Sequence, residues 1–395
     1  MDGRETGNRS EPGNGRQKGH IMDNYVIVNG KKFRKGYTTG SCAAAASKAA
    51  VSMLVSGRVV DTVDIDTPAG VRLNLPVADS VFCEDSARCS VVKDGGDDPD
   101  MTSGLKIFAE ARFRAEKGIE VKAGEGIGTV TSPGLKVKVG LPAINPVPMQ
   151  MILKEVGEVL PENRGVKITL SVPGGDRVAL KTYNPRLGIV GGISILGTSG
   201  IVVPMSEEAW KDSLALELSV AAARGRDRII YTFGNYGEDF VLNKLGLSGE
   251  LVIKTSNFLG FMLEKAVEHK IKEVLLVGHL GKIVKVAAGI FHTHSKVADA
   301  RMEILAAYAA LEGADTETVA RIYGCKTTEA AAEIINARGL EGVYGRIVEN
   351  ASKRCTGYTF DRVKVGTVLF GGGNTVLARD RAADEIIEKL GGTHG

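Results

Sequence analysis

Residues 228–291 read RIIYTFGNYGEDFVLNKLGLSGELVIKTSNFLGFMLEKAVEHKIKEVLLVGHLGKIVKVAAGIF. Short apolar runs (RIIYTFG, ELVIKT and EVLLVGH) alternate in this stretch with segments of helical periodicity (EDFVLNKLG, NFLGFMLEKAVEHK and GKIVKVAAGIF). Strands that alternate with helices predict a parallel sheet with helices on both faces, because each parallel connection needs a crossover. In open sheets of this kind, ligands bind at the carboxyl ends of the strands.

A polar or glycine-rich loop follows each expected strand, including the apolar run GIVGGISIL at 188–196. Glycines let a ligand approach the backbone closely, and a helix start offers N–H donors, which suits the polar end of a nucleotide-like cofactor. The alternative is that these glycines only permit tight turns between strands and helices. None of the loops has the P-loop pattern. The candidate cofactor-binding residues are Gly197, Thr198, Ser199, Gly200, Asn235, Tyr236 and Gly237.

The N-terminal half has a different pattern, in which strands dominate and helices are few. Asn29-Gly30 predicts a hairpin turn, and the alanine run after residue 41 predicts a helix capped by Thr39 or Ser41 and ended by Gly57. We predict a flexible tail at 1–22, an α+β sandwich domain at 23–185 and an α/β domain at 186–395. The strand VKVGTVLFGG near the C-terminus is a candidate to return to the first domain.

The composition excludes several classes of protein. The net charge is only +3 and Trp210 is the single tryptophan, which argues against nucleic-acid binding. The five cysteines form no CxxC pair, so neither a disulfide framework nor a zinc ribbon is expected, and a cytoplasmic protein fits. Residues 187–206 carry no charge, but five glycines and a proline indicate a strand and a loop rather than a membrane span.

Three segments are candidates for binding an anionic substrate. The helix start at 38–41 offers backbone donors, although ordinary capping explains the same residues. Lys93 stands beside an acidic turn, and a lysine-bearing segment follows the strand EVLLVGH. His292 and His294 lack a nearby carboxylate or cysteine, so we predict no protein metal site. The candidate substrate-binding residues are Thr38, Thr39, Ser41, Lys93, His279, Lys282, Thr293, His294 and Ser295, and no catalytic residue is assigned.

Long motifs in a fixed order resemble the CbiD family: GYTTGSCAAAASKAA at 36–50, VVKDGGDDPDMT at 91–102, GEGIGTVTSPGL at 124–135, AINPVP at 143–148, GGISILGTSGIVVPMS at 191–206, GNYG at 234–237, KTSNF at 254–258 and VGHLGKIVKVAAGIFHTHSKVADAR at 277–301. The resemblance implies transfer of a methyl group from S-adenosylmethionine to C(1) of cobalt-precorrin-5B, giving cobalt-precorrin-6A in anaerobic cobalamin biosynthesis. It also implies a Rossmann-like second domain and a tetrapyrrole substrate that brings the cobalt with it.

Two positions depart from the family pattern and remove positive charge. Ser132 stands where a basic residue is common, and Met149 stands where an arginine follows INPVP. We therefore do not assign either position to a substrate carboxylate. Two alternative functions remain at this stage: a non-catalytic corrinoid-binding pathway protein and a nucleotide-binding transferase.

Overall fold

The computed structural model of the chain describes residues 25–391, so the predicted tail at 1–22 lies outside the described part. The chain forms two compact units, each built from several segments. The first unit contains the residues up to 128 together with 142–182 and 191–205, and the second contains 129–141, 183–190 and the residues from 206 onward. This division differs from the predicted boundary at 185/186 in three segments, 129–141, 183–185 and 191–205.

The first unit is an α+β structure with a five-stranded mixed sheet in the order β6-β7-β8-β11-β9. In this sheet β9 runs parallel to β11, and the other neighbours are antiparallel. The predicted hairpin is confirmed, since β1 and β2 pair across Asn29 and Gly30, which both have positive φ. The elements of this unit are β1 (Tyr25–Val28), β2 (Lys31–Arg34), β3 (Gly36–Tyr37), α1 (Thr39–Ser56), β4 (Thr62–Asp66), β5 (Arg72–Pro76), β6 (Ala78–Cys83), β7 (Ser86–Val92), β8 (Lys106–Arg114), β9 (Gly118–Ala123), α2 (Pro146–Gly157), β11 (Gly165–Ser171), α3 (Gly175–Ala179) and β13 (Ile201–Val202).

Helix α1 forms the centre of the first unit, where it packs on β7, β8 and α2. Its alanines favour the helix and allow neighbouring backbones to approach closely, and most of its residues are buried. The predicted stop at Gly57 is confirmed, because this residue is the C-cap in the left-handed region at φ 66°. The predicted cap at Thr39 or Ser41 is wrong: Thr38 is the N-cap, and its side chain accepts a hydrogen bond from the N–H of Ser41.

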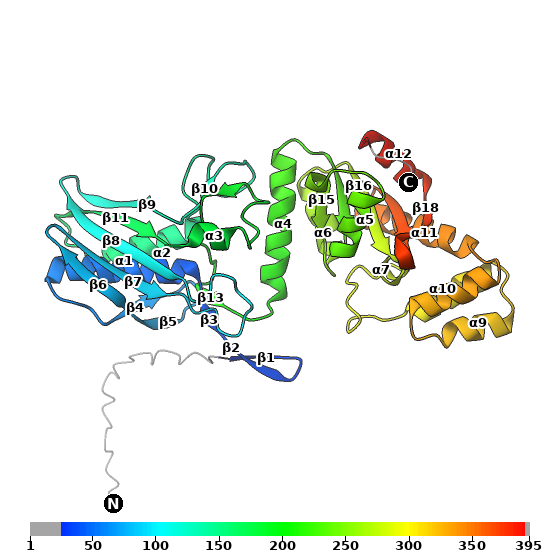
Figure 1. Cartoon of the computed structure of the whole chain (residues 1–395), viewed down its shortest axis with the longest axis horizontal. Helices are drawn as coiled ribbons and strands as arrows, with labels where there is room; N and C mark the ends of the chain where they lie inside the picture. The colour runs from blue at the N-terminus through cyan, green and yellow to red at the C-terminus, as the bar shows by residue number, and fades with distance from the viewer. Residues whose placement is uncertain (1–24, 392–395) are drawn as a thin grey trace, which may run out of the picture. The chain divides into compact units, whose positions relative to one another are not determined.

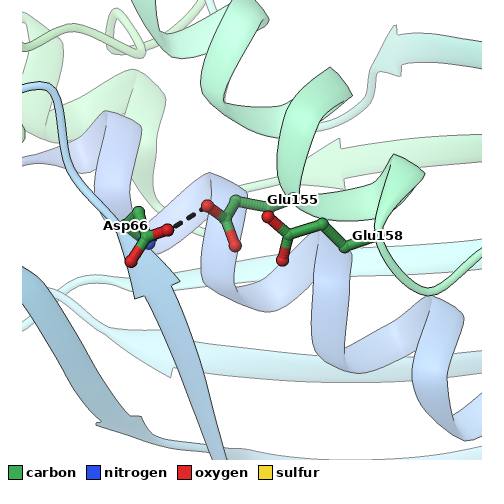
Figure 2. Close-up of side chains that lie close together, drawn as sticks. All are labelled: Asp66, Glu155 and Glu158. Atoms are coloured by element: carbon green, nitrogen blue, oxygen red, sulfur yellow. Dashed lines mark hydrogen bonds between the residues drawn. The ribbon is translucent and has the colours of Figure 1, made fainter. Parts of the chain in front are cut away.

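An ion network fastens α1 to α2. The amine of Lys48 lies 2.7 Å from a carboxylate oxygen of Glu155 and 2.6 Å from one of Glu158. Lys154 pairs with Asp66 at 3.1 Å, and the backbone N–H of Asp66 donates to Glu155 (Figure 2). Glu155 is almost fully buried, so its charge needs these partners.

The second unit contains a five-stranded sheet in the order β15-β14-β16-β17-β18 (Figure 1). The first four strands are parallel, and β18 is antiparallel to β17. The predicted alternation of strands and helices over 228–291 is therefore confirmed. The elements are β10 (Thr129–Val130), β12 (Ile189–Val190), α4 (Glu207–Ala223), β14 (Arg228–Thr232), α5 (Asn235–Asn243), η1 (Gly249–Leu251), β15 (Val252–Lys254), α6 (Leu259–Glu268), β16 (Glu273–His279), α7 (Leu280–Ala287), α8 (Arg301–Leu311), α9 (Thr316–Tyr323), α10 (Thr328–Ala337), α11 (Gly342–Tyr358), β17 (Lys364–Phe370), η2 (Gly372–Asn374), β18 (Val376–Arg379) and α12 (Arg381–Lys389).

Alternate side chains of the parallel strands enter two separate cores. One core joins the sheet to α5 and α12. The other joins the opposite face to α4, α6, α7 and α11, and includes residues from α8 to α10. No helix within residues 25–391 is long and apolar enough to cross a membrane.

Two expectations about apolar strands are wrong. The strand near the C-terminus does not return to the first unit: it is β17, which pairs with β16 and β18 in the second. All but one of its residues are buried, which requires a position inside a sheet covered on both faces. The run at 188–196 is not a strand of the parallel sheet either. Its first part forms β12 with β10, while Ile193 and Ile195 bridge to Ile127 and Ile144 in the first unit.

Candidate ligand site at the carboxyl edge of the parallel sheet

Two connections leave the middle of the parallel sheet toward opposite faces. After β14 the chain enters α5, which packs on one face and leads to β15. After β16 it enters α7, which packs on the other face. In open α/β sheets, ligands bind where neighbouring strands diverge in this way. The candidate site therefore consists of the loops at the carboxyl ends of β14, β15 and β16.

The loop after β14 contains three of the predicted cofactor residues. Asn235 begins α5, Tyr236 is 81% exposed, and Gly237 packs onto the end of the strand. A Cβ built on Gly237 would stand 2.8 Å from the Cβ of Thr232, so a larger residue does not fit there. Gly234 precedes the helix, and a Cβ built on it meets no atom within 4 Å. This loop thus combines an exposed aromatic ring with closely approachable backbone at a helix start.

Paired charges border the first turn of α5. The amine of Lys254 lies 2.8 Å from the amide oxygen of Asn235 and 2.7 Å from Glu238, and Arg186 contacts the other oxygen of Glu238 at 2.6 Å. Burial opposes ionisation of Glu238, but these two cations outweigh it, and the pKa of Glu238 lies below its ordinary value. Burial raises the pKa of Glu217, whose carboxylate lies 3.8 Å from Arg186. The network holds the start of α5 at a nearly balanced charge.

His279 ends β16 and caps the next helix. Its Nδ1 accepts a hydrogen bond from the N–H of Gly281 at 3.4 Å, and its Nε2 lies 3.6 Å from Glu329. The ring packs edge-on against Phe370 at the end of β17, with centroids 5.5 Å apart. His279 was predicted to bind substrate. The structure shows that one ring nitrogen already serves the helix start, while the imidazole remains about one third exposed.

Lys282 and Thr293 are brought together with Asn257 from the loop after β15. The amine of Lys282 donates to Asn257 Oδ1 at 2.7 Å, and it lies 3.5 Å from the backbone oxygen and the hydroxyl of Thr293. All these acceptors are neutral. Burial, followed by the charges of Lys285 and Arg301, lowers the pKa of Lys282. A half-buried ammonium with no anionic partner within 4 Å among the described residues is suited to receive a carboxylate.

Lys285 and Arg301 were not among the predicted substrate residues. Lys285 is 2% exposed, and its amine donates to the backbone oxygens of Thr293 at 3.2 Å and Ala298 at 2.7 Å. It therefore fixes the 293–298 segment on α7. Arg301 pairs with Asp299 through two hydrogen bonds of 2.6 and 2.9 Å. The sequence predicts that Lys282 and Lys285 lie three residues apart on one helix, which favours recognition of an anionic substrate, whereas nothing in the sequence placed Arg301 beside them.

His294 and Ser295 lie on the outer part of the same segment. The Nδ1 of His294 accepts the N–H of Lys296 at 3.1 Å, and Ser295 is exposed. The ring of His292 packs edge-on against Phe258 instead. Within residues 25–391, the group with metal-ligand spacing is Asp66, Glu155 and Glu158, and it contains no histidine. Figure 2 shows the three carboxylates of this group. Because Lys48 and Lys154 already neutralise them, the group is better explained as part of a structural ion network.

The predicted cofactor segment Gly197–Gly200 lies in the first unit, not at the parallel sheet. The backbone oxygen of Gly200 accepts hydrogen bonds from the N–H of Thr38 at 3.1 Å and the hydroxyl of Ser41 at 2.6 Å. The expected position after a parallel strand is wrong, because the apolar run before it finds its partners in the first unit. Contact between residues 197–200 and a cofactor stays a prediction.

The predicted substrate residues at the start of α1 are buried, and they bond to residues of the 196–200 segment. Thr38, Thr39 and Ser41 are 6%, 3% and 0% exposed. The hydroxyl oxygen of Thr39 accepts the N–H of Leu196 at 2.9 Å, and Ser41 donates to Gly200. These contacts match ordinary capping and anchoring. A role in binding substrate stays a prediction for all three residues.

Lys93 also has an ion-pair partner within the first unit. It is 2% exposed, and its amine lies 2.7 Å from a carboxylate oxygen of Asp100. Burial opposes ionisation of Asp100, but the hydrogen bonds from Lys93 and Thr102 outweigh it and lower the pKa of that carboxyl. The acidic turn therefore supplies the partner of Lys93, and a contact with substrate stays a prediction.

The two positions that depart from the family pattern have different surroundings. The hydroxyl of Ser132 accepts a hydrogen bond from Arg224 at 2.7 Å, so a guanidinium stands beside the position that lacks its own charge. Met149 packs against the core of the first unit. The positive charge lost at Ser132 is thus available from Arg224 at the C-terminal end of α4.

A separate hollow of about 580 Å³ lies between α11 and the residues after α7. It is lined by Ala288, Gly289, Phe291, Asn350, Lys353, Arg354, Gly357 and Tyr358. None of the predicted site residues is among them. The predicted residues that lie close together, Asn257's partners Lys282 and Thr293, are instead at the carboxyl edge of the sheet.

Fold and site together define an α/β protein with a candidate ligand site at the carboxyl edge of a parallel sheet. The profile of the CbiD family matches residues 26–204, and that of the CbiD C-terminal domain matches 292–381. The chain belongs to the CbiD family, as the sequence motifs had predicted.

Two relatives matched over nearly their full length support the same conclusion. A cobalt-precorrin-5B C(1)-methyltransferase of Thermoanaerobacter sp. (strain X514) is 55% identical over 360 residues, which are 91% of this chain and 98% of that protein. The protein of the same name from Alkaliphilus metalliredigens is 49% identical over 369 residues, 93% of this chain and 98% of the relative. The crystal structure of the cobalamin biosynthesis protein CbiD from Archaeoglobus fulgidus is 29% identical, covers 70% of this chain and 88% of its own, and superposes with a TM-score of 0.36.

Proposed function

We propose that this protein transfers a methyl group from S-adenosylmethionine to C(1) of cobalt-precorrin-5B and so forms cobalt-precorrin-6A. The observation that carries the proposal is the 55% identity to a relative of that name over 98% of the relative's length. Identity at this level over 91% of this chain and 98% of the relative supports the same reaction. Cobalt enters as part of the substrate, so the reaction requires no metal held by the protein.

The loop after β14 fits the cofactor. Gly234 leaves space beside the start of α5, and the exposed ring of Tyr236 offers a surface on which a purine can stack. The cofactor supplies an activated methyl group on its sulfonium. We place it at residues 234–237 rather than at 197–200, because the latter segment is bonded to α1 in the first unit.

The segment after β16 that carries Lys282, Lys285 and Arg301 fits the substrate. A ring-contracted tetrapyrrole carries several acetate and propionate arms, and each carboxylate needs a cation or N–H donors. Lys282 offers an ammonium whose present partners are neutral, and Arg301 and Lys285 add positive charge beside it. Lys285 acts as a positioning residue, since its amine is used up in holding the 293–298 segment.

The chain's contribution to the reaction is alignment and exclusion of water. Because the methyl donor is already activated and the macrocycle is electron-rich, no strong base is needed. Holding two reactants in line is worth up to about 7–11 kcal/mol of the barrier in favourable cases. This explains why neither the sequence nor the site contains a recognisable catalytic triad.

Mass spectrometry tests the proposal directly. The full chain is incubated with cobalt-precorrin-5B and S-adenosylmethionine, with S-adenosylhomocysteine replacing the methyl donor in the control. The expected result is one added methyl group only in the complete reaction. Corrinoid that binds but keeps its mass would indicate a non-catalytic carrier, and a reaction that needs a nucleoside triphosphate would indicate a nucleotide-binding transferase.

A further inference from the structure

The side-chain amide of Asn257 is bonded through its oxygen and free at its nitrogen. The oxygen accepts hydrogen bonds from the amine of Lys282 at 2.7 Å and from the hydroxyl of Thr293 at 3.2 Å. An ammonium can only donate, so the atom that faces Lys282 must be the oxygen. The nitrogen has no hydrogen-bond partner within residues 25–391, and it is not one of the fully buried unpaired atoms of that part of the chain. Its two N–H groups are therefore accessible to a ligand.

The turn that carries Asn257 has a strained backbone. Ser256 has φ 51°, in the left-handed region that a residue with a side chain rarely adopts. The N–H of Phe258 closes the turn by donating to the backbone oxygen of Thr255 at 2.9 Å, and the backbone oxygen of Asn257 accepts the N–H of Thr293 at 2.9 Å. Strain of this kind persists only where the surroundings impose it, and it is common at ligand sites. The turn is thus an element whose shape favours a functional role.

A neutral residue at position 257 leaves the charge of Lys282 uncompensated. The other acceptors of this amine, the backbone oxygen and the hydroxyl of Thr293 at 3.5 Å, are neutral as well. Burial and the neighbouring cations Lys285 and Arg301 lower the pKa of Lys282, so an anionic partner would stabilise the ammonium. An aspartate would have nearly the same shape as the asparagine and would supply that partner from the protein itself. With asparagine in its place, the negative charge is left for a ligand to supply.

A carboxylate matches the donors at this turn. The ammonium of Lys282 and the amide N–H groups of Asn257 are neighbours, because the ammonium is bonded to the oxygen of the same amide. A carboxylate has two oxygens, and the bond that it accepts from an ammonium is strengthened by charge. A cationic ligand would instead be repelled by Lys282 and by Lys285 and Arg301 beside it.

We propose that Asn257 is a substrate-binding residue, which holds the ammonium of Lys282 in place without neutralising it and donates its own amide N–H to the same carboxylate arm of the tetrapyrrole. The inference rests on the proposed function and adds to it a second residue of the substrate site. An asparagine with a structural role alone would need only the two hydrogen bonds that its oxygen accepts. A substrate-binding asparagine must also be neutral and must donate.

The variant Asn257→Asp separates these two roles. It keeps the shape and the accepting oxygen, but it removes the N–H groups and the neutrality. The new carboxylate would pair with Lys282, so the variant should unfold at a temperature no lower than the wild type in thermal melts. Asn336→Asp is the matched control: the amide oxygen of Asn336 accepts a hydrogen bond from the hydroxyl of Tyr344 at 2.9 Å, so the same charge is added to α10 instead.

Calorimetric titration of the full chain with cobalt-precorrin-5B and with S-adenosylhomocysteine measures both affinities. In Asn257→Asp, corrinoid affinity should fall at least about 10-fold, because a donor is lost and a negative charge faces the substrate carboxylate. Affinity for S-adenosylhomocysteine should stay within about 2-fold of the wild type, since the cofactor is placed at the loop after β14. Asn336→Asp should change neither affinity.

Two results in Asn257→Asp would overturn the inference while leaving the methyltransferase intact. Unchanged corrinoid affinity would show that residue 257 only holds the turn together. A loss that is confined to S-adenosylhomocysteine, or is equal for both ligands, would show that it does not act on the substrate carboxylate. If Asn257→Asp does not fold, Asn257→Ala takes its place, and unchanged corrinoid affinity in that variant also contradicts the inference. A wild-type protein that does not bind cobalt-precorrin-5B would instead contradict the proposed function, and this inference with it.

Discussion

Replacing Lys282 with methionine removes one positive charge from the candidate substrate site. One N–H of its amine is taken by Asn257 at 2.7 Å, and the two contacts with Thr293 at 3.5 Å are weak. No carboxylate lies within 4 Å of this amine among the described residues, so the ammonium retains donor capacity for a ligand. Methionine keeps a long apolar side chain of similar reach and cannot donate.

The expected loss follows from the number and kind of contacts. A hydrogen bond from an ammonium to a carboxylate contributes about 1.5–3 kcal/mol. Part of this lost binding free energy is offset, because the variant no longer has to bury a charge. We therefore expect corrinoid affinity to fall by about 1–3 kcal/mol, roughly 5- to 150-fold. A solvated surface lysine would change affinity by less than about 0.5 kcal/mol.

Calorimetric titration of cobalt-precorrin-5B and of S-adenosylmethionine into wild type and variant measures both affinities. Only the corrinoid affinity should fall. Lys265→Met is the matched control, because the amine of Lys265 pairs with Glu268 on the same helix, α6. Unchanged corrinoid affinity, or a loss confined to the cofactor, would remove Lys282 from the substrate site.

The pH dependence gives a second readout with a defined sign. Burial, Lys285 and Arg301 lower the pKa of Lys282, so its charge is lost at a lower pH than that of an ordinary lysine. Corrinoid affinity should therefore fall as pH rises through that pKa. Lys282→Met should lack this part of the decrease, and an identical pH profile for wild type and variant would contradict the assignment.

Three further predictions concern stability and the tail. Lys48→Met leaves the buried Glu155 without its main cation, so unfolding free energy should fall by about 3–5 kcal/mol, and denaturant unfolding measures it; a loss below about 1 kcal/mol would refute the network's importance. The folded-state pKa of Asp100 lies below its unfolded value, so its pairing with Lys93 stabilises the protein above the unfolded pKa. That stability is lost as pH falls through the folded pKa; Asp100→Asn should be less stable near neutral pH and flatten this acid-side slope in thermal melts. Deletion of residues 1–22, which contain too little apolar sequence to form a core, should leave turnover unchanged; a clear decrease in the methyl-transfer assay would show that the tail contributes.

Local patterns in the sequence determined the elements of the second unit. The apolar runs and helical segments of 228–291 become β14 to β16 and α5 to α7. Ser206 caps α4, as serine before an acidic first turn predicts. These features follow from interactions within a few residues of one another. The motifs likewise identified the family, because a long motif in a fixed order is a property of the sequence itself.

Only the tertiary structure decided which distant segments pair. An apolar run such as VKVGTVLF is compatible with any buried strand, so its place beside β16 depended on the faces that α11 and α12 cover. For the same reason, Ile193 and Ile195 pair with Ile127 and Ile144, and Gly197–Gly200 belongs to the first unit. The hydrophobic periodicity of a segment indicates that one of its faces is buried. It does not identify the elements against which that face packs.

Some features of the candidate site could likewise be predicted from the sequence, and others only from the tertiary structure. The sequence pattern predicts that Asn235 and Lys282 follow the ends of strands, and the structure places them in the first turns of α5 and α7 at the carboxyl edge of the sheet. The buried amine of Lys285 and the hydrogen bond between Asn257 and Lys282 could not be read from sequence. Whether a polar group has a partner depends on every atom around it, and those atoms come from elements far apart in the chain.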